Sequence, residues 1–153
     1  MLLLNFNVNA GLLDNASAAF FGHINDIQSR FSDDQFISGS NIKTGKINEN
    51  ALGMDAIHNG KGSISLIQME DKYFIQLESD FYSSPGPDYY VYVSNEINIQ
   101  DENDFYSSKQ VEVGMLLKGS GASFYEVSSP QDINSVTIMC KKFREFIASA
   151  DLT

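Results

Sequence analysis

The chain has 153 residues, a formal net charge of −10 and 42% hydrophobic residues. This length and apolar content suit one folded domain and exclude global disorder. An acidic surface repels phosphate and anionic lipid, so we expect neither nucleic-acid nor membrane-surface binding. No apolar stretch approaches the roughly 20 residues that span a bilayer, and we expect no transmembrane segment. The single cysteine excludes an internal disulfide and clustered thiolate metal sites.

Residues 1–42 are predicted to be an N-terminal extension that packs on the rest of the domain. Residues 2–8 alternate loosely, as in a strand, and the first four residues lack the basic flank of a signal peptide. Apolar residues at steps of three and four then predict an amphipathic helix over about 12–31. They are Leu12, Ala16, Ala19, Phe20, His23, Ile24, Ile27 and Phe31.

Residues 43–153 are predicted to form a β domain, because short alternating runs recur between turn signals. The first two runs, 63–69 and 72–79, flank Glu70-Asp71 as a hairpin does. A rigid Pro-Gly-Pro turn precedes a run of β-branched and aromatic residues at 89–93. Further strands are expected at 111–117, 123–127 and 134–142, with a polar connection at 94–110 and a strand or helical turn at 143–152. The fold class is therefore mainly β, an antiparallel sandwich or barrel with an N-terminal helix.

Cys140 lies near the end of the last clear strand, and the sequence leaves its role open. Alternation places it on the same face as Val136, Ile138 and Lys142, and its two apolar neighbours predict an inert thiol in the core. Three cations, Lys141, Lys142 and Arg144, follow within four residues. Such neighbours can lower a thiol pKa below its free value of about 8.5 and make the sulfur reactive. An intermolecular disulfide is the third alternative.

The remaining candidate ligands do not form a metal-site pattern, so no metal is predicted. His23 lies on the apolar face of the predicted helix, and His58 lies in a glycine-flanked turn. The run from Asp101 to Asp104 offers hard oxygen ligands but lacks the glycine and distal glutamate of a calcium loop. His58, Asp101 and Asp104 are the remaining metal candidates, each more simply explained by a solvated loop.

Three segments in order, 86–93, 114–127 and 136–152, resemble the DM-thirteen domain family. The resemblance covers about 43–152, and 58–62 corresponds to an earlier histidine–glycine segment. Its motifs are a Gly-Pro-Asp turn into a strand, a leucine–glycine stretch, and a late strand with one cysteine followed by phenylalanine. The matching residues are Gly86, Pro87, Asp88, Gly114, Gly121, Cys140 and Phe143. Met139 is a departure, because the family pattern has an aromatic residue before the cysteine. Independently of the family, the Asp88 carboxylate is expected to accept backbone amide hydrogen bonds and fix its turn.

The resemblance implies an extracytoplasmic, sandwich-like accessory domain with a proposed redox or electron-transfer role. That role is centred on Cys140, with Lys141, Lys142 and Met139 in support, and it implies a redox protein or membrane cytochrome as partner. Haem ligation by Cys140 or Met139 stays open on ligand chemistry, although no haem-attachment motif is present. No stand-alone catalytic activity is expected. The alternative is a non-catalytic module that binds a ligand or protein through its loops and has a purely structural cysteine.

Overall fold

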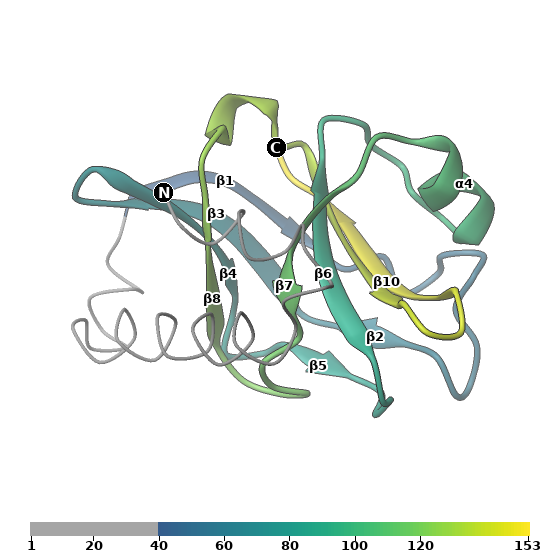
Figure 1. Ribbon diagram of the computed structural model, residues 1–153. Helices are drawn as coiled ribbons and strands as arrows, with labels where there is room; N and C mark the ends of the chain where they lie inside the picture. The colour runs from purple at the N-terminus through teal and green to yellow at the C-terminus, as the bar shows by residue number, and fades with distance from the viewer. Residues whose placement is uncertain (1–39) are drawn as a thin grey trace, which may run out of the picture.

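The computed structural model describes residues 40–153, and strands dominate their regular structure (Figure 1). Sheet A has the strand order β1-β3-β4-β8, sheet B has the order β10-β9-β6-β7, and β2 pairs with β5. All strand pairs are antiparallel. The strands are β1 (Ser40–Lys46), β2 (Gly60–Lys61), β3 (Ser63–Met69), β4 (Lys72–Leu77), β5 (Tyr82–Ser83), β6 (Tyr89–Ser94), β7 (Val111–Met115), β8 (Ser123–Val127), β9 (Ser135–Cys140) and β10 (Glu145–Asp151). The described residues also contain two short helices, α4 (Glu102–Ser107) and η2 (Pro130–Asp132).

The prediction of a mainly β, antiparallel domain is confirmed. The hairpin forms as predicted around Glu70, whose φ of 56° lets the chain reverse. The strand after the proline turn is β6, and the tail is a strand, β10, rather than a helical turn. The helix predicted over 12–31 and the strand predicted over 2–8 lie outside the described residues.

The hydrophobic core lies between the two sheets, because the inward side chains of both form one buried cluster. Leu66 and Ile75 come from sheet A, Val91 and Ile138 come from sheet B, and each is at most 1% exposed. This layer of branched apolar side chains is what period-two alternation produces when each sheet buries one face.

The two lateral edges of the sandwich differ. At the β1–β10 edge, the backbone groups of Thr44 and Thr153 exchange two hydrogen bonds of 3.0 Å, and Asn48 N donates to Ser149 O. At the β7–β8 edge lies a groove of about 330 Å³. Its lining includes the apolar side chains Val93, Val111, Val113, Val127 and Ile133. Backbone hydrogen bonds therefore close the β1–β10 edge, whereas the β7–β8 edge presents an apolar groove.

The outer face of sheet B is covered by α4, which lies within the polar connection expected over 94–110. Phe105 of α4 is buried against Tyr92, with ring centroids 4.8 Å apart. Asp101 is the N-cap, and its carboxylate accepts a hydrogen bond from Asp104 N at 2.9 Å. A six-residue helix with one buried residue has no detectable period, so the pattern could not predict it. Within residues 40–153, neither helix has the length and apolar character needed to cross a membrane.

Candidate functional site

Cys140 is the last residue of β9, and its side chain points into the core. It is 2% exposed and belongs to the same buried cluster as Val136 and Ile138, the face that strand alternation predicted. The structure thus places the sulfur among hydrocarbon groups of both sheets. A thiol in such surroundings packs as a small apolar group and is shielded from solutes in water.

The cross-strand neighbour of Cys140 is Tyr89, the first residue of β6. Directly opposed antiparallel residues have Cβ atoms about 4.5–5.5 Å apart, and both side chains belong to the core cluster. Burial raises the pKa of the Tyr89 hydroxyl, and the nearby Cys140 thiol adds to that rise. The phenol therefore stays neutral beside the sulfur.

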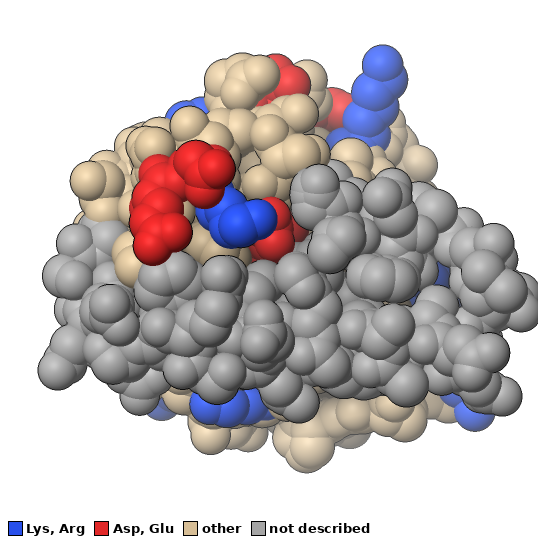
Figure 2. Space-filling view, turned by 60° about the vertical axis from the view of Figure 1, so that its left-hand side comes forward, with Lys and Arg blue, Asp and Glu red and all other residues tan. Residues whose placement is uncertain are grey.

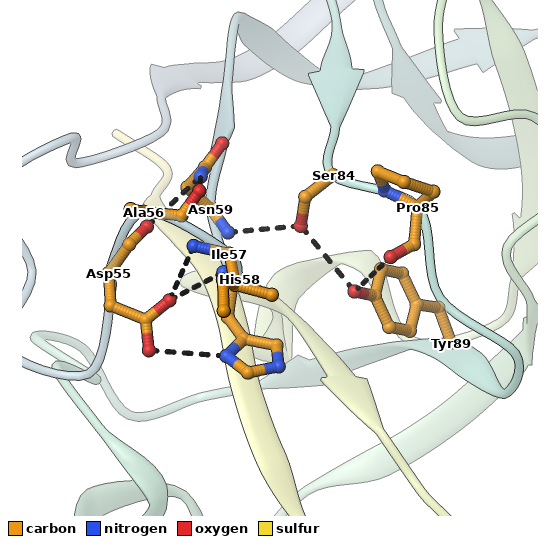
Figure 3. Close-up of polar contacts among 8 residues, drawn as sticks. All are labelled: Asp55, Ala56, Ile57, His58, Asn59, Ser84, Pro85 and Tyr89. Carbon is orange, nitrogen blue, oxygen red and sulfur yellow. Dashed lines mark hydrogen bonds and ion pairs between the residues drawn. The ribbon is translucent and has the colours of Figure 1, made fainter.

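The Tyr89 hydroxyl contacts Ser84 and Pro85 in the turn before β6 (Figure 3). It donates to the Pro85 carbonyl oxygen at 3.0 Å and lies 3.4 Å from Ser84 Oγ. Ser84 Oγ in turn accepts a hydrogen bond from Asn59 N at 3.1 Å. A chain of polar contacts thus links the ring beside Cys140 to the segment around His58.

The segment around His58 is held by Asp55. One carboxylate oxygen of Asp55 accepts hydrogen bonds from Ile57 N and His58 N at 2.7 and 2.6 Å, and the other lies 3.2 Å from His58 Nδ1. The backbone hydrogen bond from His58 is the main reason that the pKa of Asp55 is lowered. This segment borders a groove of about 440 Å³ whose lining includes Asp55, Asn59, Lys61 and Tyr82. The polar chain from Tyr89 therefore ends at an open groove.

The Gly-Pro-Asp turn packs directly on Tyr89. A Cβ atom placed on Gly86 would lie 2.1 Å from the Tyr89 ring, so a glycine is needed for this close approach. The carbonyl oxygen of Asp88 accepts a hydrogen bond from Lys141 N at 2.9 Å, which ties the turn to the residue after Cys140. The interaction seen at Asp88 thus uses its backbone, whereas the sequence led us to expect its carboxylate.

Two other motif glycines have backbone angles that side chains seldom adopt. Gly114 has φ 155° and lies where the β6–β7 register shifts, between the pairs Val91–Gly114 and Tyr92–Glu112. Gly121 has φ 83° just before β8. Both glycines therefore shape strands and turns, and neither is part of the Cys140 neighbourhood described above.

The three cations after Cys140 lie in the β9–β10 turn, and each contacts another group. Lys141 Nζ lies 2.7 Å from Glu112 Oε1 and 4.5 Å from the centre of the Tyr90 ring. Lys142 lies over the Phe143 ring, and Arg144 stacks 3.8 Å from the Tyr106 ring. Lys142 was expected to share the face of the sulfur, but it follows the last residue of β9 and is exposed. These contacts give no support to activation of the thiol by cations.

The described surface in Figure 2 carries charges of both signs. On the face that Figure 2 shows, acidic side chains gather beside basic ones. The pairs Lys141–Glu112 and Lys72–Glu126, with nitrogen–oxygen distances of 2.7 and 3.3 Å, follow the same arrangement. Any partner of this surface therefore meets charges of both signs.

Met139 points to the opposite side of sheet B from Cys140. It is 0% exposed and packs with Tyr92, Phe105 and Phe146 under α4. The two sulfurs cannot act together as ligands, and neither lines the grooves described above. The packing on both faces of β9 does not fit a haem in this fold.

The metal candidates have other partners. Asp101 caps the N-terminus of α4, and the Asp104 carboxylate accepts a hydrogen bond from Gln100 N at 2.9 Å in the loop before the helix. His58 pairs with Asp55. Within residues 40–153, no three His, Cys, Asp or Glu side chains come together as a metal site.

A family model described as "Electron transfer DM13" matches residues 52–152. The chain belongs to this family. The match spans the His58 segment, the Gly86 turn and the strand of Cys140, which are the segments that meet around Tyr89. No curated protein and no solved structure matches the chain.

Sequence reasoning singled out Cys140, Gly86 and His58 but missed Tyr89 and Ser84. Alternation puts Tyr89 on the same face as Val91 and Val93, which was an available sign that its ring is buried. Its pairing with Cys140 depends on strand register between segments about 50 residues apart, which one sequence does not reveal.

Proposed function

We propose that this chain is an electron-transfer domain whose redox group is the Cys140 sulfur, with Tyr89 as its contact to the surface. The observation that carries the proposal is the cross-strand pair Tyr89–Cys140, buried together where the family's segments meet. The polar contacts from the Tyr89 hydroxyl to the groove at Asp55 support a route for electron transfer to the surface at this end of the sandwich.

The proposed step is a one-electron oxidation. The Cys140 thiol loses its proton and one electron and becomes a thiyl radical. The electron passes through Tyr89 to a one-electron acceptor at the groove, and the proton is taken up by water that reaches the sulfur when this end of the sandwich opens locally. A one-electron donor and a proton from water restore the thiol. Removal of an electron needs no collision with the sulfur, so this chemistry is compatible with a thiol that is 2% exposed.

Burial gives the proposed centre its selectivity. Nucleophilic chemistry and thiol–disulfide exchange need a thiolate that another molecule can reach. A sulfur packed against Val136 and Ile138 is protected from both. The proposed role is therefore electron exchange alone, with no stand-alone catalytic activity.

The partner we propose is a one-electron redox protein, such as a membrane cytochrome, in an extracytoplasmic compartment. The support for the compartment is the family resemblance. The support for the docking place is the groove near Asp55, which offers Lys61, Tyr82 and the Asp55 carboxylate to a partner. Fractionation of the native host, with detection of the full chain outside the cytoplasm, tests the location.

Protein-film voltammetry of the full chain tests the redox group. We expect one reversible one-electron wave that disappears in Cys140→Ala. Met139→Leu is the matched control, because it removes the neighbouring sulfur from the opposite face of the same strand. A wave that survives in Cys140→Ala, or no wave in the folded wild type, would contradict the proposal.

A binding module with a structural cysteine is the second candidate, and the burial of Cys140 in the core favours it. The apolar groove at the β7–β8 edge, with Val111 and Val113 in its lining, is a surface such a module could use. If Cys140→Ala changes stability but leaves binding of the native partner unchanged, this second function replaces the first.

A further inference from the structure

The outward face of sheet A is buried, although it points away from the core. Its side chains form two rows across β3, β4 and β8, in which each residue is the register partner of the next. All six side chains are at most 6% exposed. The rows are Ser65–Gln76–Phe124 and Ile67–Phe74–Glu126.

The described members of the buried apolar cluster on this face belong to the strands of sheet A and to the residue before β8. Ile67, Phe74 and Phe124 form it, with Met69 and Ala122 packed against them. The outer face of sheet B is different, because there α4 contributes Phe105 to the cluster. A single layer of side chains on a sheet face stays in contact with water unless another layer covers it. Within residues 40–153, the cluster includes no such second layer.

We propose that residues 12–31 cover this face as an amphipathic helix. Residues 32–39, which can span up to about 26 Å when extended, link the segment to Ser40, the first residue of β1, and β1 is the edge strand of sheet A. A 20-residue helix is about 30 Å long, whereas four strands at about 4.8 Å spacing span about 14 Å. The segment is therefore close enough and long enough to cross the face.

The chemistry of the two surfaces is complementary. The stripe through Phe20, Ile24 and Ile27 is apolar and recurs at helical spacing. The centre of the sheet face presents Phe74 and Phe124, which together offer a large apolar area. The inference adds a defined surface for the N-terminal segment and does not depend on the redox role of Cys140.

A tryptophan reporter tests this inference, because the natural chain has no tryptophan. Phe124→Trp in the full chain places one indole on the proposed docking face, and Phe74→Trp is the alternative reporter if the first does not fold. We expect blue-shifted emission with little acrylamide quenching. Adding Ile24→Asp, which puts a charge on the apolar stripe, should raise the quenching constant several-fold.

Two matched controls make the result specific. Asn25→Asp adds the same charge on the helix face opposite the apolar stripe and should leave the quenching unchanged. Phe105→Trp reports on the outer face of sheet B, which α4 covers, and should not respond to Ile24→Asp. Equal quenching of the Phe124→Trp reporter with and without Ile24→Asp would overturn the inference. Quenching that rises on dilution of the otherwise natural chain would instead identify a second copy as the cover.

Discussion

Cys140 and the turn that follows it are adjacent in sequence, but they occupy different environments. The sulfur faces the hydrocarbon layer between the sheets, whereas Lys141, Lys142 and Arg144 contact groups in or near the surface turn. The reason is geometric: the strand ends at Cys140, and the chain reverses before β10. Closeness along a chain therefore does not predict electrostatic contact, and Tyr89, about 50 residues away, is the nearer chemical partner.

The largest effect expected from this comparison is on stability. Cys140→Ser puts a hydroxyl into an apolar layer, and an unsatisfied buried polar group costs about 1–3 kcal/mol. Lys142→Ser changes an exposed turn residue and should stay within about 0.5 kcal/mol. Urea unfolding of the two variants measures the difference. Equal stabilities would mean that the sulfur is not packed as described.

A smaller effect is expected when the cations are removed. Replacing Lys141, Lys142 and Arg144 by glutamine removes the ion pair with Glu112 and three ring contacts, at a cost of about 0–1 kcal/mol for each exposed pair. Alkylation of Cys140 by iodoacetamide in the folded protein should stay slow and unchanged. A tenfold fall in the alkylation rate of the triple variant would show that the cations do act on the sulfur.

The smallest effect concerns pH and two surface carboxylates. The backbone hydrogen bond from Ser63 lowers the pKa of Asp80, and that from His58 lowers the pKa of Asp55. A lowered folded pKa means that the unfolded chain binds the proton more tightly, so the contribution is present above about pH 4 and lost below it. In thermal unfolding, the melting temperature should fall less on acidification in Asp80→Asn than in the wild type. Identical pH profiles would contradict this account.

Strands were predictable from the sequence because alternation and turn residues are local signals. The face of Cys140 followed from the same alternation, as did the hairpin around Glu70. The helix α4 was not predictable, since its acidic residues serve as caps and only Phe105 is buried. The site around Tyr89 could not be predicted either, because the register of Tyr89 with Cys140 and the close packing of Gly86 on the Tyr89 ring depend on the tertiary structure.

The central claim is that electrons leave Cys140 through Tyr89, and site-resolved mass spectrometry after one-electron oxidation tests it most directly. The full chain is treated with hexachloroiridate(IV) in the presence of oxygen, and oxygenated products of Cys140 are quantified. The account predicts that Tyr89→Phe lowers oxidation of Cys140 at least tenfold. Tyr73→Phe, at a partly buried ring packed on the same core, should leave it unchanged. Equal oxidation in the wild type and Tyr89→Phe would contradict the account.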